Sequence, residues 1–67
     1  MTPELKKAFD LVKKFHPTVS IVAFNKMGQW QYMDENFKSF DFDGKIDADV
    51  LLDAADSIVE LPFIYQE

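Results

Sequence analysis

The positions of the three prolines constrain this chain more than any other feature. A proline fits the first turn of an α-helix, but farther along it removes a backbone hydrogen bond and clashes with the preceding turn. The residue before a proline is also biased away from helical geometry. Pro3 can therefore begin a helix, Pro17 must end it at about His16, and Pro62 limits any helix that precedes it.

The segment between the first two prolines has the pattern of an amphipathic helix. Thr2 is a suitable N-cap, and Glu4 complements the positive end of the helix dipole. Apolar residues recur at three- and four-residue spacing, and the intervening positions are mostly lysine. The predicted apolar face consists of Leu5, Ala8, Phe9, Val12 and Phe15.

The next part of the chain predicts a β-hairpin. Residues 18–24 are rich in β-branched side chains and too short for an independent helix, which indicates a strand. Residues 25–28 have the composition of a turn. Residues 29–33 alternate in character, so Trp30 and Tyr32 should share one face of a second strand.

Two further segments can add a strand. Phe40 and Phe42 alternate with polar residues, which predicts a short third strand before the Asp-Gly turn at 43–44. Residues 63–67 can form either a short strand or an ordered tail. The sequence does not decide between them.

A second helix is predicted between these two segments. Asp47 is a suitable N-cap, and the helix should run over residues 48–60 and stop before Pro62. Its apolar face consists of Val50, Leu51, Ala54, Ala55 and Ile58.

Together these elements predict one small α+β domain over residues 1–67, in the order α-β-β-(β)-α. An antiparallel sheet of two or three strands packs against the N- and C-terminal helices. The simplest packing places both helices on one face of the sheet, so the other face is partly open and can receive a partner.

The composition narrows the functional classes. The chain contains no cysteine, so no disulfide and no thiolate nucleophile or ligand is available. No apolar run approaches the ~20 residues of a membrane span, and the first residues lack the apolar core of a signal peptide. We therefore expect a cytoplasmic protein that does not bind membranes.

Charge is distributed unevenly. Residues 1–33 carry five lysines against two carboxylates, a balance of +3, whereas residues 34–67 carry two lysines against ten carboxylates, a balance of −8. The net charge is −5, and all the basic residues are lysine. Because phosphate and base recognition depend heavily on arginine, direct binding to nucleic acid is not expected.

The second predicted helix carries an acidic stripe. Four carboxylates recur at spacings of 4, 3 and 4, which confines them to about 60° of the helix circumference. The ~6 Å between neighbours along the axis resembles the spacing of phosphates along a nucleic-acid strand. The stripe consists of Asp49, Asp53, Asp56 and Glu60, and Asp43 and Asp47 extend it toward the preceding turn.

Two interpretations of the stripe remain open. It can bind a basic protein surface, even one that handles nucleic acid, which would suit a small inhibitor or adaptor such as a phage or mobile-element anti-defence protein. It can equally be a solvated face that keeps the protein soluble, partly neutralised by lysines of the first helix. The function predicted from the sequence is the first: a non-enzymatic protein-binding module.

Residues 39–50 resemble the twelve-residue calcium loop of EF-hand proteins at four inner positions. Two departures weaken the match, because Ser39 replaces the first carboxylate and Val50 replaces the bidentate glutamate at position twelve. We therefore expect neither a metal site nor any other cofactor. The alternative of a weak Ca²⁺-responsive module would use Asp41, Asp43 and Asp47.

Catalytic side chains are scarce. His16 is the only histidine, and its position after the first helix favours interaction with the terminal carbonyls of that helix over acid–base work. No glycine-rich phosphate loop is present. We therefore expect no enzymatic activity and no catalytic residues.

An aromatic group offers a second candidate interface. Its members can anchor a partner or a second copy in a homodimer, because tryptophan and tyrosine are frequent at binding hot spots. They can equally form the sheet face on which the helices pack. The group consists of Trp30, Tyr32, Phe40 and Phe42.

Overall fold

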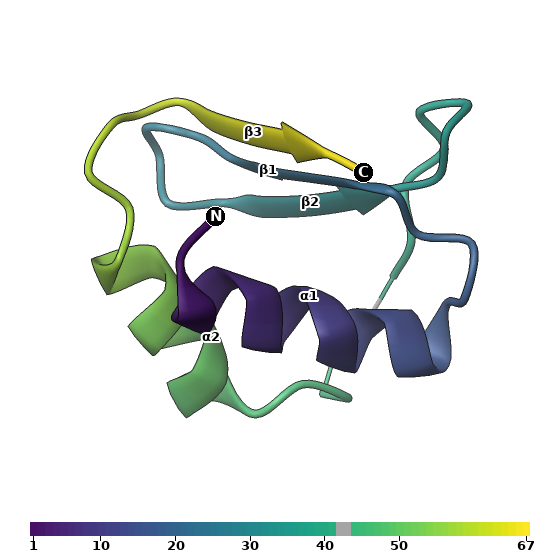
Figure 1. Ribbon diagram of the computed structural model, residues 1–67, viewed down its shortest axis with the longest axis horizontal. Helices are drawn as coiled ribbons and strands as arrows, with labels where there is room; N and C mark the ends of the chain where they lie inside the picture. Colours follow the sequence, from purple (N-terminus) through teal and green to yellow (C-terminus); the bar gives the residue numbers. More distant parts are fainter. Residues whose placement is uncertain (42–43) are drawn as a thin grey trace.

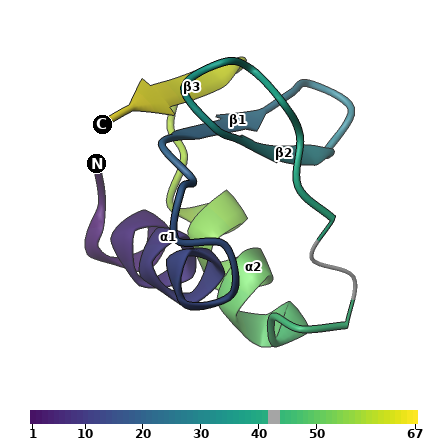
Figure 2. The same ribbon diagram turned by 90° about the vertical axis from the view of Figure 1, so that its right-hand side faces the viewer.

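The computed structural model describes residues 1–41 and 44–67 and shows two layers (Figure 1). One layer holds two helices, and the other is a three-stranded antiparallel sheet, so the predicted small α+β fold is confirmed. Both helices lie on the same side of the sheet (Figure 2). The elements are α1 (Pro3–Phe15), β1 (Ile21–Phe24), β2 (Trp30–Met33), α2 (Ala48–Asp56) and β3 (Phe63–Gln66).

The third strand is β3. Within the described residues the strand predicted around Phe40 is wrong, since Phe40 lies in no strand. The strand order is β2-β1-β3, with both outer strands antiparallel to β1. The segment after β2 makes only an isolated bridge, between Ser39 and Met33, because the chain must then cross to the helix layer and begin α2. Phe42 lies outside the described residues.

Helix α1 has the limits that the prolines predict. Pro3 is its first residue, and the Thr2 hydroxyl oxygen accepts a hydrogen bond from the Leu5 amide at 3.2 Å. One residue of the predicted apolar face is not buried in the core: the Phe15 side chain is 47% exposed. Figure 1 shows α2 beside the N-terminal half of α1 only, so the last turn of α1 has no helix packed against it.

Helix α2 is shorter than predicted. It ends at Asp56, and the backbone then turns through Ser57 and Ile58, whose amides bond to carbonyls of the last turn. The early end has a tertiary reason, since the chain must return from the helix layer to the sheet within six residues to begin β3 at Phe63.

A chain of hydrogen bonds joins the two helix ends. The Ser57 hydroxyl donates to the Ala54 carbonyl at 2.6 Å, and its oxygen lies 2.7 Å from the hydroxyl oxygen of Thr2. Because the Ser57 proton is directed to Ala54, the Thr2 hydroxyl donates to Ser57 while it accepts from Leu5. One side chain thus serves as both the N-cap of α1 and a support for the end of α2.

The core lies between the sheet and the helices. Tyr32 and Val22 pair across the strands and are fully buried against Phe9 and Val12 of α1. The Phe9 ring contacts Tyr32 with ring centres 6.3 Å apart. Burial raises the pKa of the Tyr32 phenol above its ordinary value of 10.0, because the phenolate would lose its hydration.

Candidate functional site

The outer face of α2 carries a row of acidic side chains. This helix is shallowly packed, since Ala54 is its one fully buried residue. Three carboxylates of the predicted stripe, those of Asp49, Asp53 and Asp56, are exposed. The predicted direction of these three side chains toward solvent is therefore correct. We call Asp49, Asp53 and Asp56 the acidic face.

The other members of the predicted stripe are placed differently. Glu60 is exposed but lies beyond the end of α2, in the connection to β3, so it does not continue the helical row. Asp47 is the N-cap, and its carboxylate accepts a hydrogen bond from the Asp49 amide at 2.9 Å. It has a local structural role. Asp43 lies outside the described residues.

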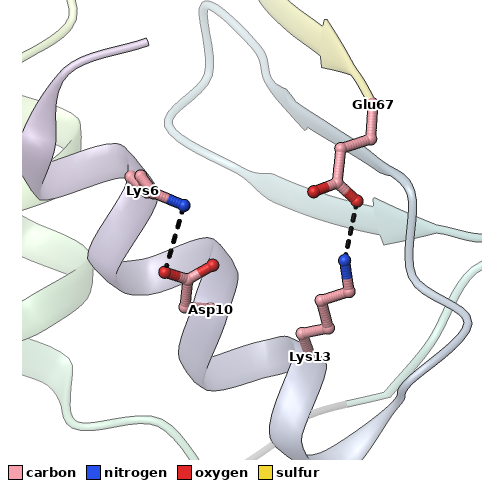
Figure 3. Close-up of polar contacts among 4 residues, drawn as sticks. All are labelled: Lys6, Asp10, Lys13 and Glu67. Atoms are coloured by element: carbon pink, nitrogen blue, oxygen red, sulfur yellow. Dashed lines mark hydrogen bonds and ion pairs between the residues drawn. The ribbon is translucent and has the colours of Figure 1, made fainter.

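No lysine of α1 forms an ion pair with the acidic face among the described residues. Figure 3 shows the two ion pairs found among residues 1–41 and 44–67. Lys6 pairs with Asp10 of the same helix at 3.4 Å, and Lys13 pairs with Glu67 after β3 at 2.9 Å. Both pairs turn away from α2. The sequence left open an intramolecular partner for the stripe, and the described residues provide none.

A shallow hollow of about 190 Å³ separates α1 from the acidic face. It is lined by Lys7 and Glu4 of α1 and by Asp53 and Val50 of α2. Lys7 and Asp53 therefore border the same hollow without forming an ion pair. The gap leaves the Asp53 carboxylate open to solvent and to an incoming cationic group.

Leu52 is a component of this surface that the sequence interpretation missed. Its side chain is 60% exposed, although α2 has an apolar side against α1. Three- and four-residue spacing places Leu52 beside Asp49 and Asp56 on the helix surface. The sequence does contain a signal for it, because Leu52 lies outside the predicted apolar face and at helical spacing from two of the acidic residues. Protein interfaces combine apolar contacts with a polar rim, and Leu52 with its acidic neighbours offers both kinds of group.

Three members of the predicted aromatic group lie in or against the core. Tyr32 is fully buried, and Trp30 is half-buried and packs against both parts of the core. Phe40 is also packed there, and its ring stacks on His16 with centres 4.6 Å apart. These three residues pack between the sheet and the helices, as the packing interpretation expects, and Phe42 lies outside the described residues.

His16 serves to join two segments. Its backbone amide donates to the Val12 carbonyl, as expected for a residue that closes α1. Its Nε2 atom lies 3.0 Å from the carbonyl oxygen of Asp41, to which it can donate. The Asp41 carbonyl and the Phe40 ring thus orient the imidazole. Together these two contacts attach the segment after β2 to the helix layer.

The EF-hand resemblance does not extend to the structure around it. No helix precedes the loop, because the residues before it form β2 and a turn. Among the described residues, no three histidine or acidic side chains come close enough to hold a metal ion. Asp41 is exposed, Asp47 caps α2, and the loop's Asp43 is not among the described residues.

Neither a membrane-spanning helix among the described residues nor a similar known protein was found. In the part of the chain that the structure describes, no helix is long and apolar enough to cross a membrane. Comparisons with protein-family models, with curated proteins and with solved structures found no significant match.

Proposed function

We propose that this chain is a non-enzymatic protein-binding module that presents the acidic face of α2 to a basic surface of another protein. The observation that carries the proposal is the combination of three exposed, unpaired carboxylates with an exposed leucine on one helix surface. A helix pays a small cost for like charges at i+4, a few tenths of a kcal/mol for each pair. Asp49 and Asp53 accept this cost without an interleaved lysine.

The geometry supports a partner that handles nucleic acid. Asp49 and Asp53 are one helical turn apart, about 6 Å along the axis, which is near the spacing of strand phosphates. A protein surface built to hold phosphates can accept carboxylates at that spacing. Leu52 would add an apolar anchor, which a purely electrostatic mimic lacks. An inhibitor or adaptor that occupies such a surface fits these features.

A charge-matched comparison tests the proposal. The tagged protein is used to capture partners from a lysate at low salt, alongside the triple variant Asp49→Asn, Asp53→Asn and Asp56→Asn. The control variant removes the same number of charges elsewhere, through Asp10→Asn, Glu35→Gln and Glu67→Gln. Any captured protein is then purified and titrated directly against all three forms.

We expect a basic partner that binds the wild type and the control variant and loses at least tenfold in affinity with the triple variant. Binding should weaken as salt rises, because the screening length falls from ~10 Å at 0.1 M to ~3 Å at 1 M. Leu52→Ser should weaken binding relative to the wild type. Met27→Ser, at an exposed residue of the β1–β2 turn, should not. Equal loss with both triple variants would mean that only net charge matters, and it would overturn the proposal.

A further inference from the structure

The two edges of the sheet differ in how far other parts of the chain cover them. The β2 edge is partly covered by the segment that follows it, since the Phe40 amide donates to the Tyr32 carbonyl at 2.8 Å and Ser39 bridges to Met33. Among residues 1–41 and 44–67, β3 pairs with β1 alone. Figure 2 shows β3 at the edge of the sheet above α1, whereas α2 lies toward the β2 side. The β3 edge is therefore open.

The register shows which backbone groups face the open side. The Glu67 amide donates to the Ser20 carbonyl of the neighbouring chain segment at 2.8 Å. Because backbone groups of alternate residues in a strand point to the same neighbour, those of Tyr65 also face β1. The N–H and C=O groups of Ile64 and Gln66 consequently point away from the sheet, two donors and two acceptors in a row.

Strand β3 is short, with four residues, but it carries none of the side-chain or bulge features that protect exposed edges. Such edges usually carry a lysine, a proline or a bulge within the strand. The four residues of β3 are uncharged and regularly paired, and Ile64 in their midst is 71% exposed. The first charge after the strand, on Glu67, is held by Lys13 of α1. The uncharged, regular edge can therefore accept another strand, although its short length limits the strength of the pairing.

We propose that β3 pairs with β3 of a second copy of this chain, antiparallel and about a two-fold axis at Tyr65. In this register Ile64 lies opposite Gln66 of the second copy, so the outward N–H and C=O groups form four inter-strand hydrogen bonds. Tyr65 lies opposite Tyr65 of the second copy, and both side chains are on the face of the sheet that the helices cover. The two Ile64 side chains become diagonal neighbours on the other side, about 7–8 Å apart.

Charge favours the antiparallel pairing over the parallel one. Each copy has a net charge of −5, so like charges near the axis would oppose association. The antiparallel register places the two Glu67 residues at opposite ends, about 13 Å apart along the strands. This exceeds the screening length of ~8 Å at physiological salt. A parallel pair would place the two carboxylates side by side.

The small area of this edge determines how tight the dimer can be. A stable interface buries about 800 Å² on each partner, and four strand residues provide only a fraction of that. The dimer should therefore be weak and depend on concentration. It leaves the acidic face of α2 free, so it is independent of the proposed function and doubles the number of acidic faces in each assembly.

Sedimentation and amide exchange of the purified chain test the proposal. Between about 10 μM and about 1 mM, the weight-average mass should rise toward that of a dimer. Over the same range, the amides of Ile64 and Gln66 should become protected, whereas exchange of the Met27 amide, which donates to Asn25 within the turn, should not change. A constant monomer mass, or a rise in mass without protection of these two amides, would overturn the pairing.

Substitutions on the strand give a second measurement. Ile64→Lys should return the mass to that of the monomer at all concentrations, and Ile64→Val should leave the dimer intact; circular dichroism confirms that both variants fold. The triple asparagine variant of the acidic face should still dimerise, which separates this proposal from the proposed function. A dimer that persists in folded Ile64→Lys would place the interface elsewhere and refute the inference.

Discussion

Replacing Phe9 by alanine tests the central contact between the helix layer and the sheet. The Phe9 side chain is 1% exposed and contacts the rings of Tyr32 and Tyr65 with centres 6.3 and 6.1 Å away. Truncating a buried phenylalanine costs about 3–5 kcal/mol, from lost burial and from the cavity that remains. A domain of this size has a total free energy of unfolding of roughly 3–10 kcal/mol. Phe9→Ala should therefore remove about a third of the stability or more.

Phe15→Ala is the matched control, because the same residue type lies on the same helix and was assigned to the same apolar face. Its ring is half exposed and lies below the ammonium of Lys45, at 5.8 Å. Losing this contact and partial burial should cost only about 1 kcal/mol. Urea unfolding followed by Trp30 fluorescence and circular dichroism measures both variants. Equal losses in the two variants would refute the placement of the core between α1 and the sheet.

Two further predictions concern polar groups of the core and the helix ends. The raised pKa of Tyr32 means that the unfolded chain ionises first, so stability should be full below pH 10 and fall above it, by about 1.4 kcal/mol at pH 11. Urea unfolding at pH 9 and pH 11 should show this loss in the wild type and in Tyr65→Phe, and its absence from Tyr32→Phe would confirm the source. Thr2→Ala and Ser57→Ala should each cost about 1–2 kcal/mol. The double variant should cost less than the sum by at least 0.5 kcal/mol, because both remove the same hydrogen-bond chain, and strict additivity would contradict that chain.

Some of the candidate site could be predicted because it depends on local spacing alone. The direction of Asp49, Asp53 and Asp56 follows from 3.6 residues per turn once the apolar side of α2 is packed. The shorter helix could not be predicted in the same way. Glu60 satisfies the helical spacing, and only the need to reach β3 from Asp56 removes it from the helix.

Tertiary contacts decided the other differences between the prediction and the structure. Phe9 and Phe15 have the same pattern in the sequence, but α2 covers only the first half of α1, so one ring is buried and the other is not. Trp30 and Tyr32 were assigned correctly to one strand face. Whether that face met helices or a partner depended on which side of the sheet the helices crossed to, which no local spacing encodes.

By itself, the sequence determined the limits of α1, the β1–β2 hairpin, the α+β class and the uneven charge. These features follow from caps, prolines, turn residues and side-chain periodicity, all of which act within a few residues. Only the tertiary structure decided that residues 63–66 form the third strand, that Lys6 and Lys13 of α1 pair away from α2, and that Leu52 and Ile64 remain exposed. Each of these depends on contacts between residues far apart in the chain, because pairing partners and layer geometry are chosen when the elements pack together.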